Sequence, residues 1–182
     1  MRVAPITETY PPEVTGVALT LERLVQGLRA LSHDVQLVRP RRGKDDVGVR
    51  VDGFEEVLAR GIVLPLYRSL RLGFPSRKRL LSGWRMVLPD VVHIATKGPL
   101  GWSALSAARR LRIPVVSSYH TNSHEYGKHY GLGCLQSVAL RYLKAFHNLG
   151  QATFVPTERR WPVAKIDSRE IPGLHVYGLS EG

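Results

Sequence analysis

The sequence predicts an α/β protein built on a doubly wound, parallel sheet. Two observations lead to this fold class. Short apolar runs that suit buried strands alternate with longer stretches in which apolar residues recur at helical spacing. Most of these runs also end in turns rich in Gly, Pro or polar residues. With 182 residues, 43% of them hydrophobic, the chain is large enough for one domain with a core, but not for two.

The first third of the chain predicts two strands with a helix between them. Residues 3–7 suit a strand, although Pro5 removes a backbone donor from it. Residues 35–38 suit a second strand, which Pro40 closes. Between them, apolar residues recur with helical periodicity, at Leu21, Leu24, Val25, Leu28 and Leu31.

The middle of the chain is less regular. Residues 40–53 are basic and unpatterned, so we expect an exposed loop there. A strand is expected near 61–64, and part of the basic stretch 67–88 is expected to be helical.

The remaining part predicts further strand-and-helix units. The expected strands are 90–95, 114–119 and 152–155, and the expected helices run from about 101 to 112 and from about 135 to 147. This alternation completes a Rossmann-like pattern.

The charge of the chain favours an anionic partner, because the net charge is +11, with 26 basic against 15 acidic residues. One basic group contains Arg68, Arg71, Arg77, Lys78, Arg79 and Arg85, and a second contains Arg39, Arg41, Arg42 and Lys44. A solvated basic face, a patch for an anionic membrane surface and a nucleic-acid surface remain open as readings. We expect no nucleic acid, because no nucleic-acid-binding motif is present.

The single cysteine, Cys134, excludes an internal disulfide framework and a cysteine-cluster metal site. The first residues do not form a signal peptide, and no apolar run is long enough to span a membrane. We therefore expect a cytoplasmic protein.

Polar residues follow three strands, at the edge where doubly wound sheets bind ligands. After the first strand, Gly16 stands at a helix start, where backbone N–H groups can meet a phosphate. A plain turn glycine is the alternative, because the segment is neither a G-x-G-x-x-G fingerprint nor a P-loop. In the segment 93–101, Lys97 stands at the strand end and could face a ligand, whereas His93 is expected to be buried within the strand.

The third segment, 118–126, is the densest polar cluster in the chain. His120 is placed there for proton transfer or hydrogen bonding. His124 and Glu125 could join it as metal ligands, but no third ligand is obvious, so we expect no metal site. Serine hydrolase chemistry has no support, because no Gly-x-Ser-x-Gly motif occurs.

Together these segments resemble the N-terminal domain of family 4 retaining glycosyltransferases with the GT-B fold. The resemblance is strongest to the bacterial group that makes mannosylated or glucosylated lipids. The matching segments occur in order over about residues 1 to 157 and are TETYPPEVTGVALTLERLVQGLRA, DVQLVRP, PDVVHIATKGPLGWSALSAARRL, IPVVSSYHTNSHEY, HYGLG, YLKAFHN and FVPT.

The resemblance implies a role for several residues. Gly16 and Val17 would lie against the donor diphosphate, and His120 would lie in the active centre near the donor sugar. Residues on the acceptor side would be Glu13, Thr121 and Lys97. The basic stretch that includes Arg68, Arg71, Arg77, Lys78 and Arg79 would suit an anionic membrane or lipid acceptor. Lys97 departs from the family pattern, in which an acid is common, and reverses a charge at the ligand edge.

The implied reaction moves a hexose from GDP-mannose or UDP-glucose to a lipid or another hydroxyl acceptor, with retention of configuration. No cofactor is implied beyond the nucleotide sugar as substrate, and no metal on an Asp-x-Asp motif. Residues 1–178 would form the acceptor-side, Rossmann-like half of a GT-B fold, and 179–182 a tail. The C-terminal donor-binding half, with its E-x7-E motif, is not in this sequence.

We therefore expect a glycosyltransferase domain that is inactive alone and peripheral on the inner face of the plasma membrane. The alternative is a non-catalytic module that binds anionic lipid or a partner protein.

Overall fold

The structure is a computed structural model that describes residues 1–13, 15–64, 67–118, 141–142, 146, 149–150 and 152–154. The side chains of 64–70 and 152–154 lie outside this description. The chain divides into two compact units, Met1–Val115 and Val116–Gly182.

A largely parallel sheet forms the centre of the first unit. Its parallel strands are β1 (Arg2–Ile6), β2 (Asp34–Pro40), β4 (Phe54–Ala59) and β7 (Val91–Ile94). They lie in the order β4-β2-β1-β7, and the short β3 (Arg50–Val51) pairs antiparallel with β4 at the edge. The predicted α/β class with a parallel sheet is confirmed. The expectation of a loop throughout 40–53 is wrong at β3.

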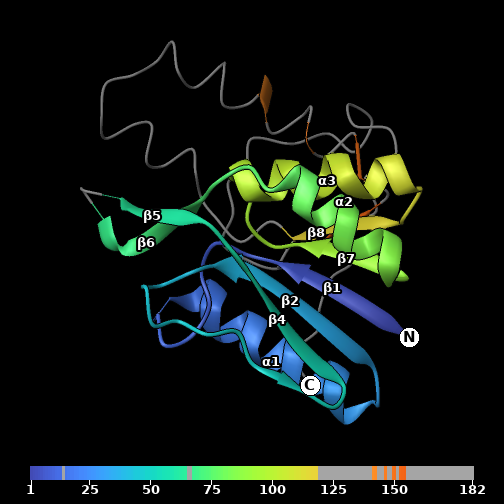
Figure 1. Cartoon of the computed structure of the whole chain (residues 1–182), viewed down its shortest axis with the longest axis horizontal. Helices are drawn as coiled ribbons and strands as arrows, with labels where there is room; N and C mark the ends of the chain where they lie inside the picture. Colours follow the sequence, from blue (N-terminus) through green and yellow to red (C-terminus); the bar gives the residue numbers. More distant parts are fainter. Residues whose placement is uncertain are drawn as a thin grey trace, which may run out of the picture. The chain divides into compact units, whose positions relative to one another are not determined.

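Helices cover both faces of this sheet (Figure 1). α1 (Gly16–Ala30) lies on one face, and α2 (Arg77–Met86) and α3 (Pro99–Leu111) lie on the other. α1 turns Ala18, Leu21 and Val25 toward the sheet. Leu21 and Val25 belong to the predicted apolar face, but Leu24 and Leu31 of that face are 38% and 70% exposed. Its N-cap is Thr15, whose hydroxyl accepts a hydrogen bond from the Ala18 amide at 3.1 Å. Among the described residues, no helix has the length and apolarity needed to cross a bilayer.

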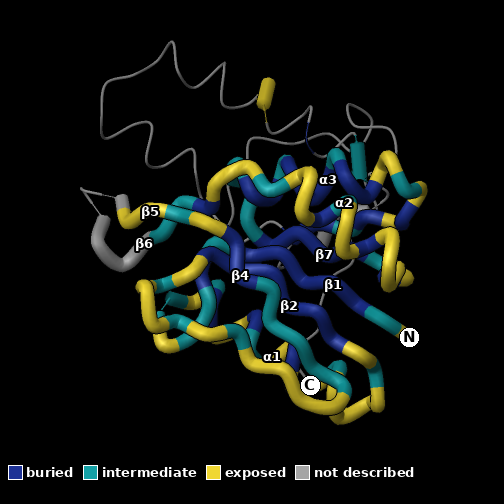
Figure 2. Tube along the Cα trace, viewed as in Figure 1, coloured by how far each residue is buried: buried dark blue, intermediate teal, exposed yellow. Residues whose placement is uncertain are grey.

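The core of this unit lies between the sheet and its helices, and Figure 2 shows the buried residues along β1, β2 and β7. Ile6, Leu37 and Ile94 have no exposed surface. Trp84 of α2 is also buried, and its indole Nε1 donates to Gln36 Oε1 of β2 at 2.8 Å. This bond satisfies the one polar atom that the indole brings into the core.

Pro5 occupies an inner strand, opposite His93 of β7. Both residues are buried, which agrees with the expected buried position of His93. The flanking backbone bonds from Thr7 to Val38 (3.0 Å) and from Ala95 to Ile6 (2.9 Å) hold the end of β1 in place despite the donor that Pro5 lacks.

Residues 61–73 form a hairpin of β5 (Gly61–Leu64) and β6 (Tyr67–Gly73) beyond the carboxyl ends of the parallel strands (Figure 1). The expected helix within 67–88 is therefore confined to α2. The hairpin packs closely where it ends, because a Cβ on Gly73 would lie 2.8 Å from the Leu100 Cβ. That position requires a residue without a side chain.

A buried ion cluster joins the carboxyl end of β2 to its surroundings. Arg39 is 3% exposed. Its guanidinium donates to Asp46 at 2.7 and 3.0 Å and to Glu56 at 3.1 and 2.8 Å. The hydrogen bond from Arg39 lowers the pKa of Asp46 from 3.8 to about 2. Arg39 thus belongs to the interior and not to the solvated basic group that the sequence suggested.

β8 (Val115–Ser118) begins at the last residue of the first unit and continues into the second. It pairs in parallel with β9 (Ala152–Phe154). Both strands were predicted, over the slightly wider ranges 114–119 and 152–155. The helix expected over 135–147 falls mainly outside the described residues.

Replacing Arg39 by Ala would leave the carboxylates of Asp46 and Glu56 buried without their cation. We expect the free energy of unfolding to fall by about 3–5 kcal/mol. Arg41→Ala removes an equal charge from an exposed neighbour and should change the free energy of unfolding by less than about 0.5 kcal/mol. Urea denaturation measures both, and equal effects would contradict a buried cluster.

Candidate functional site

Two loops of the first unit meet at the carboxyl ends of β1 and β7. The Glu8 amide, in the β1–α1 loop, donates to Thr96 Oγ1 in the β7–α3 loop at 2.7 Å. Within the first loop, the hydroxyls of Thr9 and Thr15 lie 3.1 Å apart. These contacts hold both loops at the edge where ligands of doubly wound sheets bind.

The N-terminus of α1 is open at this edge. Gly16 and Val17 are its first two residues, and no hydrogen bond from either amide occurs among the described residues. A Cβ on Gly16 would meet nothing within 4 Å, and the first turn contains no acid. The helix therefore presents unpaired N–H groups and the positive end of its dipole to a ligand.

The N-terminus of α3 is closed by an internal carboxylate. The Leu100 amide donates to Glu8 Oε1 at 3.4 Å, and a Cβ on Gly98 would overlap the Glu8 carboxylate. Burial raises the pKa of Glu8 to about 7, although backbone hydrogen bonds from Leu100 and Gly73 act in the opposite direction. Local sequence patterns do not reveal this role of Glu8, because its partner lies 92 residues away.

Lys97 lies in the β7–α3 loop at the end of the strand, as predicted, and is partly buried. Burial lowers the pKa of its ammonium group to about 8. Lys97 and Glu8 therefore give this edge two groups that titrate near neutral pH, which is common at functional sites.

Glu13 reaches from the β1–α1 loop to the hairpin. Its Oε1 lies 3.7 Å from Arg71 Nε, with the two side chains 14% and 23% exposed. Its Oε2 is buried and has no hydrogen-bond partner among the described residues. Glu13 is thus tied to the hairpin, and Arg71 faces this site rather than an outward basic patch.

The other predicted residues lie elsewhere. Arg77, Lys78 and Arg79 are exposed in the first turn of α2, and Arg79 Nη1 also donates to the Leu58 carbonyl at 2.6 Å. The side chain of Arg68, and the whole of His120 and Thr121, lie outside the described residues. Four residues of the predicted site therefore lie in or beside the adjoining β1–α1 and β7–α3 loops. They are Glu13, Gly16, Val17 and Lys97.

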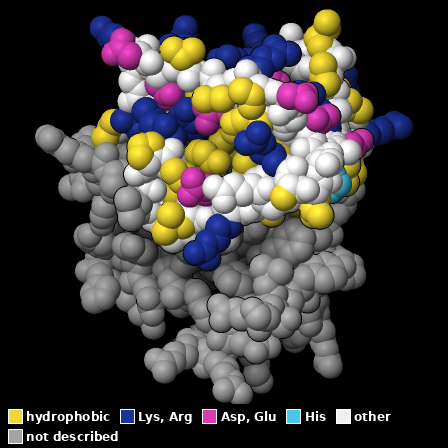
Figure 3. Space-filling model, turned by 90° about the horizontal axis from the view of Figure 1, so that it is seen from below, with side chains coloured by type: hydrophobic (Ala, Val, Ile, Leu, Met, Phe, Trp, Pro, Cys, Tyr) yellow, Lys and Arg dark blue, Asp and Glu magenta, His cyan; other side chains and the backbone are white. Residues whose placement is uncertain are grey.

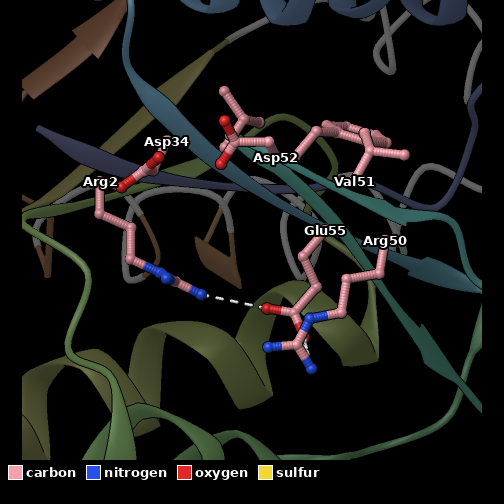
Figure 4. Close-up of a pocket in the computed structure, with 9 residues that line it drawn as sticks. Arg2, Asp34, Arg50, Val51, Asp52 and Glu55 are labelled. Carbon is pink, nitrogen blue, oxygen red and sulfur yellow. Dashed lines mark hydrogen bonds and ion pairs between the residues drawn. The ribbon is translucent and has the colours of Figure 1, made fainter.

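A hollow of about 520 Å³ lies at the opposite, amino edge of the sheet (Figure 4). It is lined by Arg2, Asp34, Val35, Arg50, Val51, Asp52, Gly53, Phe54 and Glu55. Three of its charged residues pair with one another, because Glu55 lies 3.0 Å from Arg2 and 3.9 Å from Arg50. The hollow lacks the apolar walls that small-molecule sites favour and lies away from the ligand edge.

Other classes of site find little support in the described part of the chain. It contains no group of three or more His, Cys, Asp or Glu that could hold a metal. The alternative metal ligands, His120, His124 and Glu125, are outside it. On the face in Figure 3, acidic side chains lie among the basic ones around an apolar centre, unlike the basic stripe of a nucleic-acid-binding surface.

The comparisons with known proteins agree with this geometry. The family model for Glycosyltransferase Family 4 matches residues 14–159. A GDP-mannose-dependent alpha-mannosyltransferase from Corynebacterium glutamicum is 34% identical over 86% of this chain and 38% of its own length. The enzyme of the same name from Mycolicibacterium smegmatis is 31% identical over 98% and 47%. An alpha-monoglucosyldiacylglycerol synthase from Acholeplasma laidlawii is 31% identical over 69% and 31%. The chain thus spans less than half the length of these relatives.

A solved structure shows the same fold. Sucrose-phosphate synthase from Thermosynechococcus elongatus superposes with a TM-score of 0.61 at 12% identity, over 97% of this chain and 47% of that one. This match confirms the Rossmann-like fold.

We expect stability to depend on pH through Glu8. A carboxyl whose pKa rises from 4.5 to about 7 on folding makes the free energy of unfolding fall as the pH rises through that window. Glu8→Gln removes the charge, so at pH 8 the variant should be more stable than wild type by about 1–3 kcal/mol, with little of that gain left at pH 4.5. Thermal unfolding across this range measures the difference. Asp45→Asn, at an exposed position, is the control, and an equal gain there would contradict the assignment.

Proposed function

This chain belongs to glycosyltransferase family 4, and from that premise we propose that it forms the acceptor-side half of a two-domain hexosyltransferase. The observation that carries the proposal is the open N-terminus of α1, where Gly16 and Val17 present unpaired amides at the ligand edge. A nucleotide sugar carries a diphosphate, and a helix N-terminus with free N–H groups suits that anion.

The chemistry requires charge stabilisation at the leaving group. When the glycosidic bond to the nucleotide breaks, negative charge grows on the diphosphate, and fixed amide dipoles stabilise it without reorganising. Gly16 and Val17 would supply such dipoles. His120, near the donor sugar, takes its role in this proposal from the family resemblance.

Acceptor binding would use the other groups of this edge. Glu13 would lie on the acceptor side by resemblance, with its carboxylate held beside Arg71 of the hairpin. Lys97 adds a cation that suits an anionic acceptor, and Thr121 would lie next to the acceptor by resemblance. No metal or further cofactor enters this mechanism.

The relatives' names favour particular substrates. Some use GDP-mannose, and others are named for glucosylated diacylglycerol. We accordingly propose transfer of mannose or glucose from GDP-mannose or UDP-glucose to a lipid or similar hydroxyl, with retention.

Because a GT-B active centre forms between two domains, half of a cleft should not catalyse at a useful rate. We expect no sugar transfer from radiolabelled GDP-mannose or UDP-glucose to diacylglycerol acceptors by the purified 182-residue chain. A fusion to the C-terminal half of the Corynebacterium relative should restore transfer, and Gly16→Val in that fusion should reduce it at least about tenfold, or 1.4 kcal/mol.

The control is Gly27→Val on the same helix, where a Cβ also meets nothing within 4 Å. Robust transfer by the 182-residue chain alone would contradict its assignment as one half of a cleft. Equal losses in the two glycine variants would contradict the role of Gly16.

A second candidate function is a module that binds anionic membrane surfaces at the inner face of the plasma membrane. Arg77, Lys78 and Arg79 occupy the first turn of α2, where the helix dipole disfavours cations, and no acid balances them there. An anionic surface would offset that cost. The same binding would bring the enzyme to a lipid acceptor.

We expect the chain to co-sediment with vesicles that contain 30% anionic lipid and to dissociate as salt is raised from 0.05 to 0.5 M. Changing both Arg77 and Lys78 to Gln should weaken binding several-fold, since each cation near the surface contributes about 1 kcal/mol. Changing Arg109 and Arg110 to Gln, at the exposed far end of α3, is the charge-matched control. Binding that ignores anionic lipid and salt would contradict a membrane role.

A further inference from the structure

Arg42 links the loop after β2 to the loop that leads into α1. Its Nη2 donates to the backbone carbonyls of Tyr10, at 3.4 Å, and of Pro11. These carbonyls lie a few residues before Gly16, in the segment that determines where α1 begins. The sequence places Arg42 in a basic group with Arg41 and Lys44, but its side chain is directed into the protein, whereas Arg41 and Lys44 are exposed.

The backbone of Arg42 is itself fixed. Asp46 Oδ2 accepts from the Arg42 amide at 2.7 Å and from Arg39 Nη1, also at 2.7 Å. Arg39 in turn binds Glu56 of β4. Arg42 therefore projects from a point anchored to two strands of the sheet through partly buried, charge-assisted hydrogen bonds.

Other contacts hold the β1–α1 loop on either side of Tyr10 and Pro11, from the Glu8 amide to Thr96 and from Glu13 to Arg71. Inside the loop, Glu13 N donates to the Tyr10 carbonyl at 3.3 Å, and Thr15 N donates to the Glu13 carbonyl at 3.1 Å. These bonds join the loop to itself. Among the described residues, Arg42 is the side chain that ties the Tyr10 and Pro11 carbonyls to the rest of the unit.

We propose that Arg42 is a positioning residue that holds the β1–α1 loop in the shape in which Gly16, Val17 and Glu13 face a ligand. Its contribution to diphosphate binding comes from loop geometry and not from its charge, because its guanidinium donates to protein carbonyls. The inference rests on the proposed binding of a diphosphate at α1.

The test uses the 182-residue chain and inorganic pyrophosphate, with affinity measured by calorimetry. Arg42→Ala should weaken binding about tenfold, which corresponds to 1.4 kcal/mol. Arg41→Ala removes the same charge one residue away, from an exposed side chain, and should weaken binding less than twofold. Arg42→Lys retains a donor near the two carbonyls and should recover part of the loss. Thermal midpoints of all variants show whether each remains folded at the temperature of the titration.

Hydrogen exchange without ligand separates this inference from the proposed function. The Glu13 and Thr15 amides, both bonded within the loop, should exchange faster in Arg42→Ala and at the wild-type rate in Arg41→Ala. If wild type does not bind pyrophosphate, the proposed donor site fails, and the exchange rates still decide the role of Arg42. Unchanged exchange in Arg42→Ala, or equal losses of affinity in the two alanine variants, would overturn the inference.

Discussion

The guanidinium of Arg39 lies where β2 ends, between a carboxylate from the following loop and one from β4. Because the buried Arg39 cation would otherwise have only Glu56 to balance it, the loop folds back so that Asp46 supplies a second carboxylate. The returning chain then passes so close to β4 that a Cβ on Gly48 would lie 2.6 Å from the Glu56 carbonyl oxygen. The same cluster anchors Arg42, and through Arg42 it reaches the loop before α1. One buried cation thus connects the sheet to the ligand edge.

Two helices begin at that edge with opposite electrostatic character. The Leu100 amide, in the first turn of α3, donates to the carboxylate of Glu8, so the positive end of this helix is already occupied. α1 begins with Gly16, exposed and without an acid in its first turn. Whenever Glu8 is ionised, an incoming diphosphate would be repelled at the start of α3 and would find free amide donors at the start of α1. The asymmetry directs the anion to α1, beside Glu13.

Local sequence patterns predicted α1, α3, the position of Gly16 and the strands β1, β2, β5, β7, β8 and β9, because each depends on neighbouring residues. They missed β3, β4 and β6. The hairpin of β3 and β4 also has a local sequence signal, the turn dipeptide Asp52-Gly53. In the structure Gly53 adopts a positive φ of 69°. The unpatterned basic stretch before this dipeptide obscured the signal. Glu8 could not be predicted in this way, since its contact with α3 spans 92 residues. Composition likewise does not reveal which basic residues are buried. Tertiary contacts decide that Arg39 is buried, that Arg42 is directed inward and that Arg41 is exposed.

The central claim is that the N-terminus of α1 is the anion site of this domain. An NMR titration of the ¹⁵N-labelled chain with GDP tests it most directly, because each amide reports separately. The largest shifts should fall on the Gly16 and Val17 amides, with smaller ones in the loop around Glu13. Largest shifts at the Leu100 amide of α3, or around Asp52 and Gly53 at the amino edge, with Gly16 and Val17 unchanged, would contradict it.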